Sequence, residues 1–231
     1  MTTSAAQDFW LASLDDAGRF NRWVFDRIAP CLSGDILEVG CGTGTFTALM
    51  ALAGHRVTAV DINPGYVEKA KARLATQSGV SIVAGDATKM TWAARFDTIV
   101  LLDVLEHIED DVGCLRQLAA CLAPGGRVVV KVPAGAWLYS PLDAAIGHYR
   151  RYSKKTLRRV FAEASLVPGD ERYFNAAGVP GWWLNGRVLK RITPPQEQIR
   201  IFETIVPLLR AVEAVARPFG LSIIANAVRP I

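Results

Sequence analysis

The sequence predicts an α/β fold in which a doubly wound, mostly parallel β-sheet is covered by helices on both faces. Short runs of β-branched residues alternate with helical stretches along most of the 231 residues, as is typical of a parallel α/β sheet. The strand candidates lack a regular alternation of polar and apolar residues, which indicates that both of their faces are buried. We therefore expect one domain, 1–231, built on seven strands.

The first part of this sheet contains five strands and the helices between them. An N-terminal segment at 17–30, with a helix at about 17–28, leads into the first strand. We expect the strands at 35–39, 56–61, 80–84, 96–102 and 127–132, and the helices at about 45–53, 64–76 and 110–122. Pro64 falls where a first-turn proline is tolerated, and Pro124-Gly125-Gly126 is expected to end the third helix.

The second part contains two more strands and a long insertion. A helix at about 153–165 begins after Ser153, a residue type favoured as an N-cap. Strands are expected at 170–174 and 222–228, with the last strand antiparallel to the others. The segment 176–221 between strands six and seven is far longer than an ordinary hairpin loop, so we interpret it as a helical cap.

Composition excludes several classes of protein. The 51% hydrophobic and 21% charged residues are globular values, and no stretch approaches the roughly 18 apolar residues that span a bilayer. The N-terminus lacks the basic and apolar regions of a signal peptide, so we expect a cytoplasmic protein. Residues 147–160 hold six Lys or Arg and no acid, as a solvated helix face would. The net charge is only +4 and no recognised binding motif is present, so no nucleic-acid partner is expected.

A glycine-rich loop follows the first strand and precedes a helix. Gly40, Gly42 and Gly44 let the backbone approach a ligand closely, and the helix directs N–H groups at an anionic part of it. Asp61 ends the second strand, where an acid in such folds binds ribose hydroxyls. An NAD-dependent oxidoreductase shares both features, but its fingerprint places a third glycine at position 45, where this chain has Thr45.

Five motifs, in order, resemble those of class I S-adenosylmethionine-dependent methyltransferases, which have a Rossmann-like fold. They are EVGCGTG (38–44), VTAVDINP (57–64), AGDAT (84–88), FDTIVLLDVLEHIED (96–110) and LAPGGRVVVKVP (122–133). The later HYRRYS segment, followed by a helix, is similar to the ubiquinone-type O-methyltransferases with a methyltransferase domain of type 11 or 12. The resemblance implies that 35–133 is the cofactor-binding core and that S-adenosyl-L-methionine is the cofactor.

The resemblance also implies roles for individual residues. The implied contacts are Glu38, Gly40, Cys41, Gly42, Gly44, Leu102 and Asp103 toward the methionine end, Asp61 toward the ribose, and Ile62, Asp86 and Ala87 toward the adenine. Two alternatives stay open. Asp86 could instead cap a turn, and Glu38 could instead only order the loop.

Methyl transfer from a sulfonium is an in-line displacement, so alignment supplies much of the rate. A hydroxyl acceptor also needs a group that removes its proton, and a histidine suits this role. The candidates are His148, at the start of HYRRYS, and His107, whose alternative role is to order the loop after strand four. We expect no metal site, because histidines and carboxylates show no further cluster and the four cysteines lack zinc-ligand spacing.

The cap carries an apolar stripe on the helix that begins at about residue 196. Its members are Ile199, Phe202, Ile205, Val206, Leu209 and Val212. We expect the stripe to pack on the domain as a lid, with Ile199, Phe202, Val206 and Leu209 mostly buried and with Trp182 or Trp183 near the mouth of the site. A dimer interface is one alternative. Peripheral membrane contact is the other, because Trp182-Trp183 beside Arg187, Lys190 and Arg191 has the composition of an interfacial segment.

The sequence thus predicts an enzyme that passes a methyl group to a hydroxyl of a small-molecule or lipid-linked acceptor. Transfer to nitrogen or carbon is less favoured. The protein is expected to be a monomer or a homodimer. The alternatives are a non-catalytic S-adenosylmethionine-binding protein and the NAD-dependent oxidoreductase.

Overall fold

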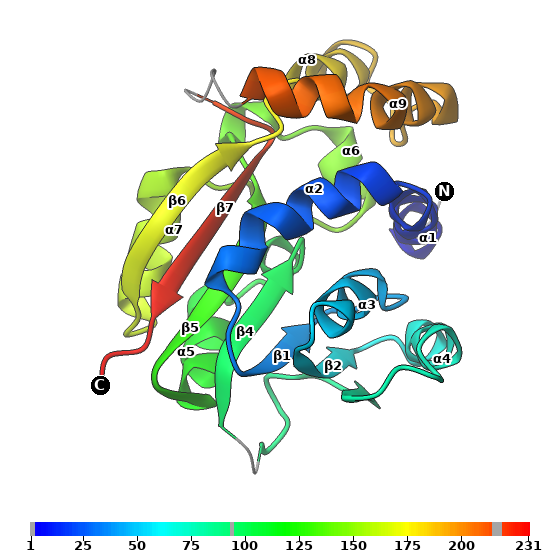
Figure 1. The fold of residues 1–231 in the computed structure, drawn as a ribbon. Helices are drawn as coiled ribbons and strands as arrows, with labels where there is room; N and C mark the ends of the chain where they lie inside the picture. Colours follow the sequence, from blue (N-terminus) through cyan, green and yellow to red (C-terminus); the bar gives the residue numbers. More distant parts are fainter. Residues whose placement is uncertain (1–2, 93–94, 214–218) are drawn as a thin grey trace.

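The computed structural model describes residues 3–92, 95–213 and 219–231, and a seven-stranded sheet forms its centre (Figure 1). The strands are β1 (Asp35–Val39), β2 (Arg56–Asp61), β3 (Val80–Ala84), β4 (Phe96–Leu102), β5 (Leu122–Pro133), β6 (Val167–Phe174) and β7 (Ser222–Val228). Their order across the sheet is β3-β2-β1-β4-β5-β7-β6. β7 is antiparallel to β5 and to β6, whereas the other neighbouring strands are parallel. The predicted sheet, with its antiparallel last strand, is confirmed.

Strand β5 is longer than predicted at its start. Leu122 pairs with Phe96, the register then shifts, and Arg127 pairs with Thr98. Helix α5 (Asp111–Ala120) ends before this pairing begins. The turn 124–126 therefore lies within the strand and does not end the preceding helix directly.

Helices cover both faces of the sheet, as Figure 1 shows. On one face lie α2 (Gly18–Ile28), α3 (Thr45–Leu52) and α4 (Pro64–Arg73), and on the other lie α5 and α7 (Lys154–Glu163). Successive residues of strand β1 pack against the helices on opposite faces of the sheet. Leu37 packs in the core beside α5 and α7, whereas Ile36 packs beside α2 and α3. Glu38 shares the face of Ile36 and so points toward α3.

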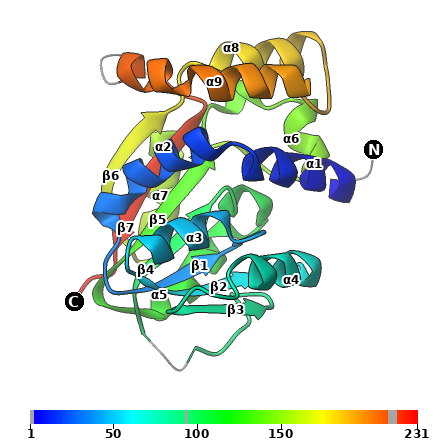
Figure 2. The same ribbon diagram turned by 45° about the vertical axis from the view of Figure 1, so that its right-hand side comes forward.

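Short helical segments connect these layers. They are η1 (Ala29–Cys31), η2 (Leu105–His107), η3 (Ala136–Leu138) and α6 (Pro141–Ala145). A further helix, α1 (Thr3–Asp15), precedes α2 and was not predicted from the small, polar start of the chain. Figure 2 shows α1 between the cap and α4, so this helix lies across the carboxyl edge of the parallel strands.

The segment between β6 and β7 forms the predicted helical cap. It consists of α8 (Gly178–Trp182), its π-helical continuation η4 (Trp183–Val188), and α9 (Gln196–Glu213). Within the parts of the chain that the structure describes, no helix has the length and apolar character needed to span a bilayer.

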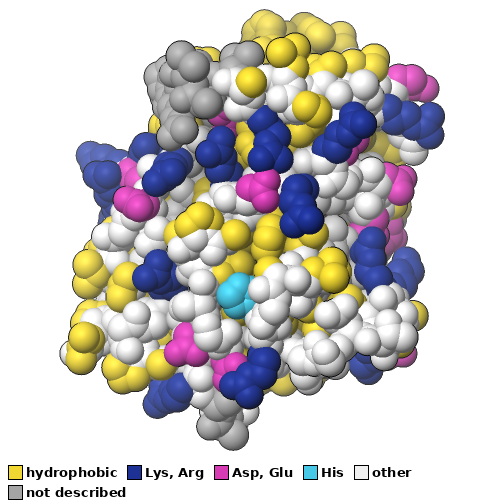
Figure 3. Space-filling model, viewed as in Figure 1, with side chains coloured by type: hydrophobic (Ala, Val, Ile, Leu, Met, Phe, Trp, Pro, Cys, Tyr) yellow, Lys and Arg dark blue, Asp and Glu magenta, His cyan; other side chains and the backbone are white. Residues whose placement is uncertain are grey.

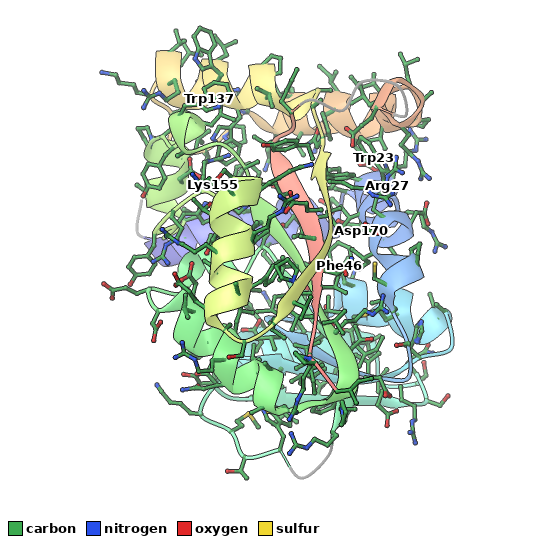
Figure 4. The ribbon with its side chains drawn as sticks, turned by 90° about the vertical axis from the view of Figure 1, so that its left-hand side faces the viewer. Trp23, Arg27, Phe46, Trp137, Lys155 and Asp170 are labelled. Atoms are coloured by element: carbon green, nitrogen blue, oxygen red, sulfur yellow. The ribbon has the colours of Figure 1, made fainter. Side chains whose placement is uncertain are left out.

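Helix α9 packs against α2, largely as predicted. Val206 is fully buried in a cluster with Trp23 and Phe174, and Phe202 and Leu209 pack at its edge. Figure 4 shows Trp23 on this side of the sheet. Of the remaining stripe residues, Ile199 is half-buried and the side chain of Val212 lies outside the described residues. Ile205 points partly to solvent and is 40% exposed.

Candidate active site

The predicted cofactor residues gather where the parallel strands end. The backbone N–H groups of Gly40 and Cys41 both donate to the carbonyl of Val60, at 2.7 and 3.0 Å. These two bonds tie the glycine loop after β1 to the end of β2. Cys41 is buried, and burial raises the pKa of its thiol well above the usual range, so it is an uncharged packing residue.

The loop needs glycine for two reasons. Gly40 and Gly42 have φ angles of +74° and +54°, in the left-handed region that other residues rarely adopt. A Cβ atom on Gly40 would lie 2.4 Å from Cγ2 of Val104, and one on Gly42 would lie 2.9 Å from Cδ1 of Leu11. The backbone therefore comes close to the segment that follows β4 on one side and to α1 on the other.

Asp61 joins the ends of two loops. Its Oδ2 accepts the N–H of Gly42 at 2.8 Å, and its Oδ1 accepts the N–H of Asn63 at 2.8 Å. Ile62, which lies between Asp61 and Asn63 in the chain, is 74% exposed at the carboxyl edge of the parallel strands. This arrangement leaves a carboxylate and an apolar side chain beside the glycine loop.

Glu38 is buried beneath this loop. Thr47, in the first turn of α3, donates its hydroxyl to Oε2 of Glu38. Burial raises the pKa of Glu38 to about 8, and the nearby Asp61 also raises it, so the carboxyl is uncharged at pH 7. The bond to Thr47 fits the alternative in which Glu38 orders the loop. A buried carboxyl of this kind would also gain from a cationic partner.

Asp86 caps a turn, as one of the two interpretations from sequence expected. Its Oδ1 accepts the N–H and the hydroxyl of Thr88 at 3.0 and 2.6 Å, and its Oδ2 pairs with Lys89 at 3.1 Å. The bond from Thr88 is the main reason that the pKa of Asp86 is lowered. Ala87 is buried, and its carbonyl accepts the indole N–H of Trp92. Contact of Asp86 and Ala87 with an adenine stays a prediction.

Asp103 is paired with a lysine that the sequence analysis did not single out. Asp103 has a left-handed φ of +56° at the end of β4, and its carboxylate pairs with the ammonium of Lys131. Lys131 is buried at 6% exposure in β5. A lysine inside an otherwise apolar strand was the available signal. Leu102, just before Asp103, is half-buried beside the core that α2 and α3 cover.

The two candidate histidines lie together. The rings of His107 and His148 meet edge to face, with centroids 4.7 Å apart. The Nδ1 of His148 lies 3.0 Å from Oδ1 of Asp143, and the same oxygen accepts Nε of Arg151 at 2.7 Å. Asp143 and Arg151 were missed. Arg151 was expected on a solvated face with its basic neighbours, but it is 6% exposed because it pairs with the buried Asp143.

Glu106 completes this cluster, and among the described residues neither of its carboxyl oxygens has a hydrogen-bond partner. It is fully buried, and its Oε1 lies 3.7 Å from Nε2 of His148. Burial raises the pKa of Glu106 well above its usual range, and the charge of Asp103 raises it further. Burial, with a smaller effect of His148, lowers the pKa of His107 to about 4, so that imidazole is neutral at pH 7.

Glu106, His107 and His148 could hold a metal ion. Each offers one ligand atom, and these atoms lie within 4.8 Å of one another. Two imidazoles and a carboxylate are donors that divalent transition metals accept. The expectation that histidines and carboxylates form no such cluster is therefore wrong. The absence of a metal stays a prediction.

The cluster lies close to the glycine loop in space, because Val104 contacts both. Val104 packs against Gly40, and the N–H of His107 donates to the carbonyl of Val104 at 2.9 Å. The cap also contacts the cluster, and α1 contacts the cap. The ring of Trp182 in the cap lies 4.5 Å from the guanidinium of Arg151. The same ring packs against Trp10 of α1, with ring centroids 5.7 Å apart. Trp182 thus lies near the site, as predicted. The site thus places an imidazole nitrogen of His148 beside a glycine loop of the kind that binds cofactors, and both lie beneath the cap.

Known proteins resemble this chain in sequence and fold. Residues 37–130 match the model of a family described as a methyltransferase domain. The ubiquinone biosynthesis O-methyltransferase of Methylocella silvestris is 42% identical over an alignment of 177 residues that covers 68% of this chain and 68% of that one. The nodulation protein S of Bradyrhizobium diazoefficiens is 36% identical over 130 residues, and the match spans 51% of this chain but only 62% of that protein.

A solved structure shows the same fold. The N-methyltransferase NodS from Bradyrhizobium japonicum, in complex with S-adenosyl-L-homocysteine, superposes with a TM-score of 0.57 at 20% identity. The superposition covers 92% of this chain and 86% of that one.

Proposed function

This chain belongs to the class I S-adenosylmethionine-dependent methyltransferases, and from that premise we propose that it methylates a hydroxyl group of a small acceptor bound beside His148. S-adenosyl-L-methionine is the cofactor. Membership of this family excludes the two alternatives from sequence, the NAD-dependent oxidoreductase and the non-catalytic S-adenosylmethionine-binding protein. The observation that carries the choice of a hydroxyl is the hydrogen bond between Asp143 and His148, next to Glu106, whose carboxyl group has no hydrogen-bond partner in the described parts of the chain.

The residues at the carboxyl edge fit this cofactor, which supplies a methyl group on a sulfonium centre when it is bound. Three of the five residues of the glycine loop are glycine, and the side chains of the other two, Cys41 and Thr43, are buried. The carboxylate of Asp61 would accept the ribose hydroxyls, and the exposed Ile62 would cover one face of the adenine. Glu38, uncharged when buried alone, would pair with the cationic amino group of the methionine end.

His148 would remove the proton of the acceptor hydroxyl. A carboxylate only accepts hydrogen bonds, so Asp143 fixes the tautomer of His148 that carries its proton on Nδ1. The lone pair of Nε2 then faces Glu106 and is free to take a proton. Burial raises the pKa of Asp143, but the bonds from His148 and Arg151 outweigh burial and keep the pKa below its usual value. Asp143 is thus a positioning residue that keeps its charge.

Glu106 would orient the acceptor. Leaving a buried polar group without a partner costs about 1–3 kcal/mol, so a polar acceptor atom that pairs with Glu106 would recover part of this cost. An uncharged carboxyl can both donate and accept a hydrogen bond. A hydroxyl matches it with one donor and two acceptor sites, and also has the proton that His148 removes. An amine with a free lone pair needs no base before it attacks.

Product analysis with matched acceptors tests this proposal. The protein is incubated with S-adenosyl-L-methionine labelled with ¹³C in the methyl group, and with a phenol and an aniline of identical skeleton. We expect the label on oxygen, identified by the chemical shift of the methyl carbon, with a rate at least about tenfold higher than for the aniline. Equal or faster transfer to nitrogen would contradict the role given to His148 and Asp143.

A further inference from the structure

The cap exposes a large apolar surface on the side that faces away from the domain. Between 40% and 65% of each side chain in this group is exposed, and we call the group the docking face. It consists of Trp183, Leu184, Val188, Leu189 and Ile192 around η4, and Ile201, Ile205 and Leu208 on α9. Figure 3 shows hydrophobic side chains over the top of the molecule, where the cap lies.

The docking face is separate from the face that α9 buries. Ile201, Ile205 and Leu208 are spaced by four and three residues, so they share one side of the helix. Val206, on the other side, is fully buried against α2. A surface helix normally presents polar residues to water, and contiguous exposed apolar patches mark sites of contact with a partner or a membrane. The fold itself therefore does not account for this second apolar side.

Tryptophan extends the docking face toward the site. Trp137 in η3 is 60% exposed and lies beneath α8 in Figure 4. Trp183, in the docking face itself, is 47% exposed. Indole rings favour the boundary between water and lipid, because they combine an apolar body with one polar N–H group.

Cations outnumber acids around the docking face. Arg187, Lys190, Arg191 and Arg200 are all exposed, whereas residues 176–202 contain a single acid, Glu197, which is also exposed. A two-fold contact between copies would place this surface against itself and bring the four cations near the same four of the partner. An anionic bilayer would instead attract every one of them. The charge pattern favours a lipid surface over a second copy.

We propose that the docking face binds the surface of an anionic phospholipid bilayer, with the two cap helices lying in the interface and the basic side chains at the headgroups. The other side of the same cap reaches the site through Trp182, Arg151 and Asp143. A docked molecule therefore holds its acceptor site next to the lipid phase. This proposal concerns binding and is independent of the proposed function.

Sedimentation with vesicles tests the proposal on the full chain. Vesicles of 70% phosphatidylcholine and 30% phosphatidylglycerol should pellet the protein at low salt, and binding should fall at least about fivefold in 0.5 M NaCl because salt screens the cations. Leu208→Asp should reduce binding at least about fivefold. Leu52→Asp is the matched control, since Leu52 is 72% exposed on α3, outside the cap, and its change should leave binding unaltered.

A second pair of variants tests the charges. Arg200→Glu should weaken binding, whereas Arg159→Glu on α7 makes the same charge change away from the cap and should not. Thermal unfolding monitored by circular dichroism establishes that each variant is folded. Equal pelleting of Leu208→Asp and Leu52→Asp, or no pelleting of the unmodified protein, would overturn the proposal. So would a dimer in sedimentation velocity that Leu208→Asp dissociates.

Discussion

Replacing His148 with alanine is expected to lower the turnover number of methyl transfer by about two to four orders of magnitude, the usual contribution of a positioned general base. The variant keeps the glycine loop and Asp61, so its affinity for S-adenosyl-L-homocysteine should stay within about twofold of the unmodified protein. Steady-state kinetics with a hydroxyl acceptor gives the turnover number, and isothermal titration calorimetry gives the affinity. Loss of turnover without loss of affinity is the signature of a catalytic role.

Two companion variants separate catalysis from structure. His55→Ala, in the turn before β2, should leave turnover unaltered. Asp143→Asn keeps the size of the side chain but can donate to Nδ1, so it should stabilise the wrong tautomer of His148 and lower turnover while the protein stays folded. If His148→Ala turned over as fast as the unmodified protein, the base would have to be His107, or the acceptor would need none.

Replacing Asp61 with alanine is expected to weaken binding of S-adenosyl-L-homocysteine at least tenfold. The substitution removes the proposed acceptor of the ribose hydroxyls, and each hydrogen bond to a charged group contributes about 1.5–3 kcal/mol. It also removes the bonds that Asp61 accepts from the backbone of Gly42 and Asn63, so the loop loses its tie to the end of β2. Both effects act in the same direction, and calorimetry measures their sum.

The control for this variant is Asp35→Ala. Asp35 begins β1 at the opposite edge of the sheet, where it pairs with the exposed Arg56 at 2.6 Å. Its loss should leave the affinity unaltered, because surface ion pairs contribute little. A folded Asp61→Ala protein with undiminished affinity would remove Asp61 from the cofactor site, and tighter binding of NAD than of S-adenosyl-L-homocysteine would contradict the cofactor assignment.

The sheet could be predicted because its signals are local. Strands β1 to β4 and β7 have the predicted bounds, since each is a short apolar run bounded by turn residues. The glycine loop could also be predicted, because Gly40 and Gly42 adopt left-handed backbone conformations at fixed positions after β1. Helix α1 was missed. It lacks a strong amphipathic pattern, and it is held through distant contacts such as the bonds from Thr43 and Thr45 to Asp15.

The acceptor side could be predicted only in part, because its contacts join distant segments. His107 and His148 were candidates by residue type, but nothing local indicates that their rings meet. Arg151 has the same sequence surroundings as its exposed basic neighbours, and it differs from them in its contacts with the buried Asp143 and with Trp182 of the cap. The cap shows the same limit. Its apolar residues occupy two sides of α9, and the sequence does not tell which side the domain covers.

A crystal structure of the protein with S-adenosyl-L-homocysteine tests the central claim most directly, namely that the glycine loop and the His107–His148 cluster form one active site. The result expected is electron density with the ribose hydroxyls on the carboxylate of Asp61, and with the sulfur open on the side where His148 and Glu106 lie. Density with the ribose away from Asp61, or with the sulfur facing away from both histidines, would contradict the account.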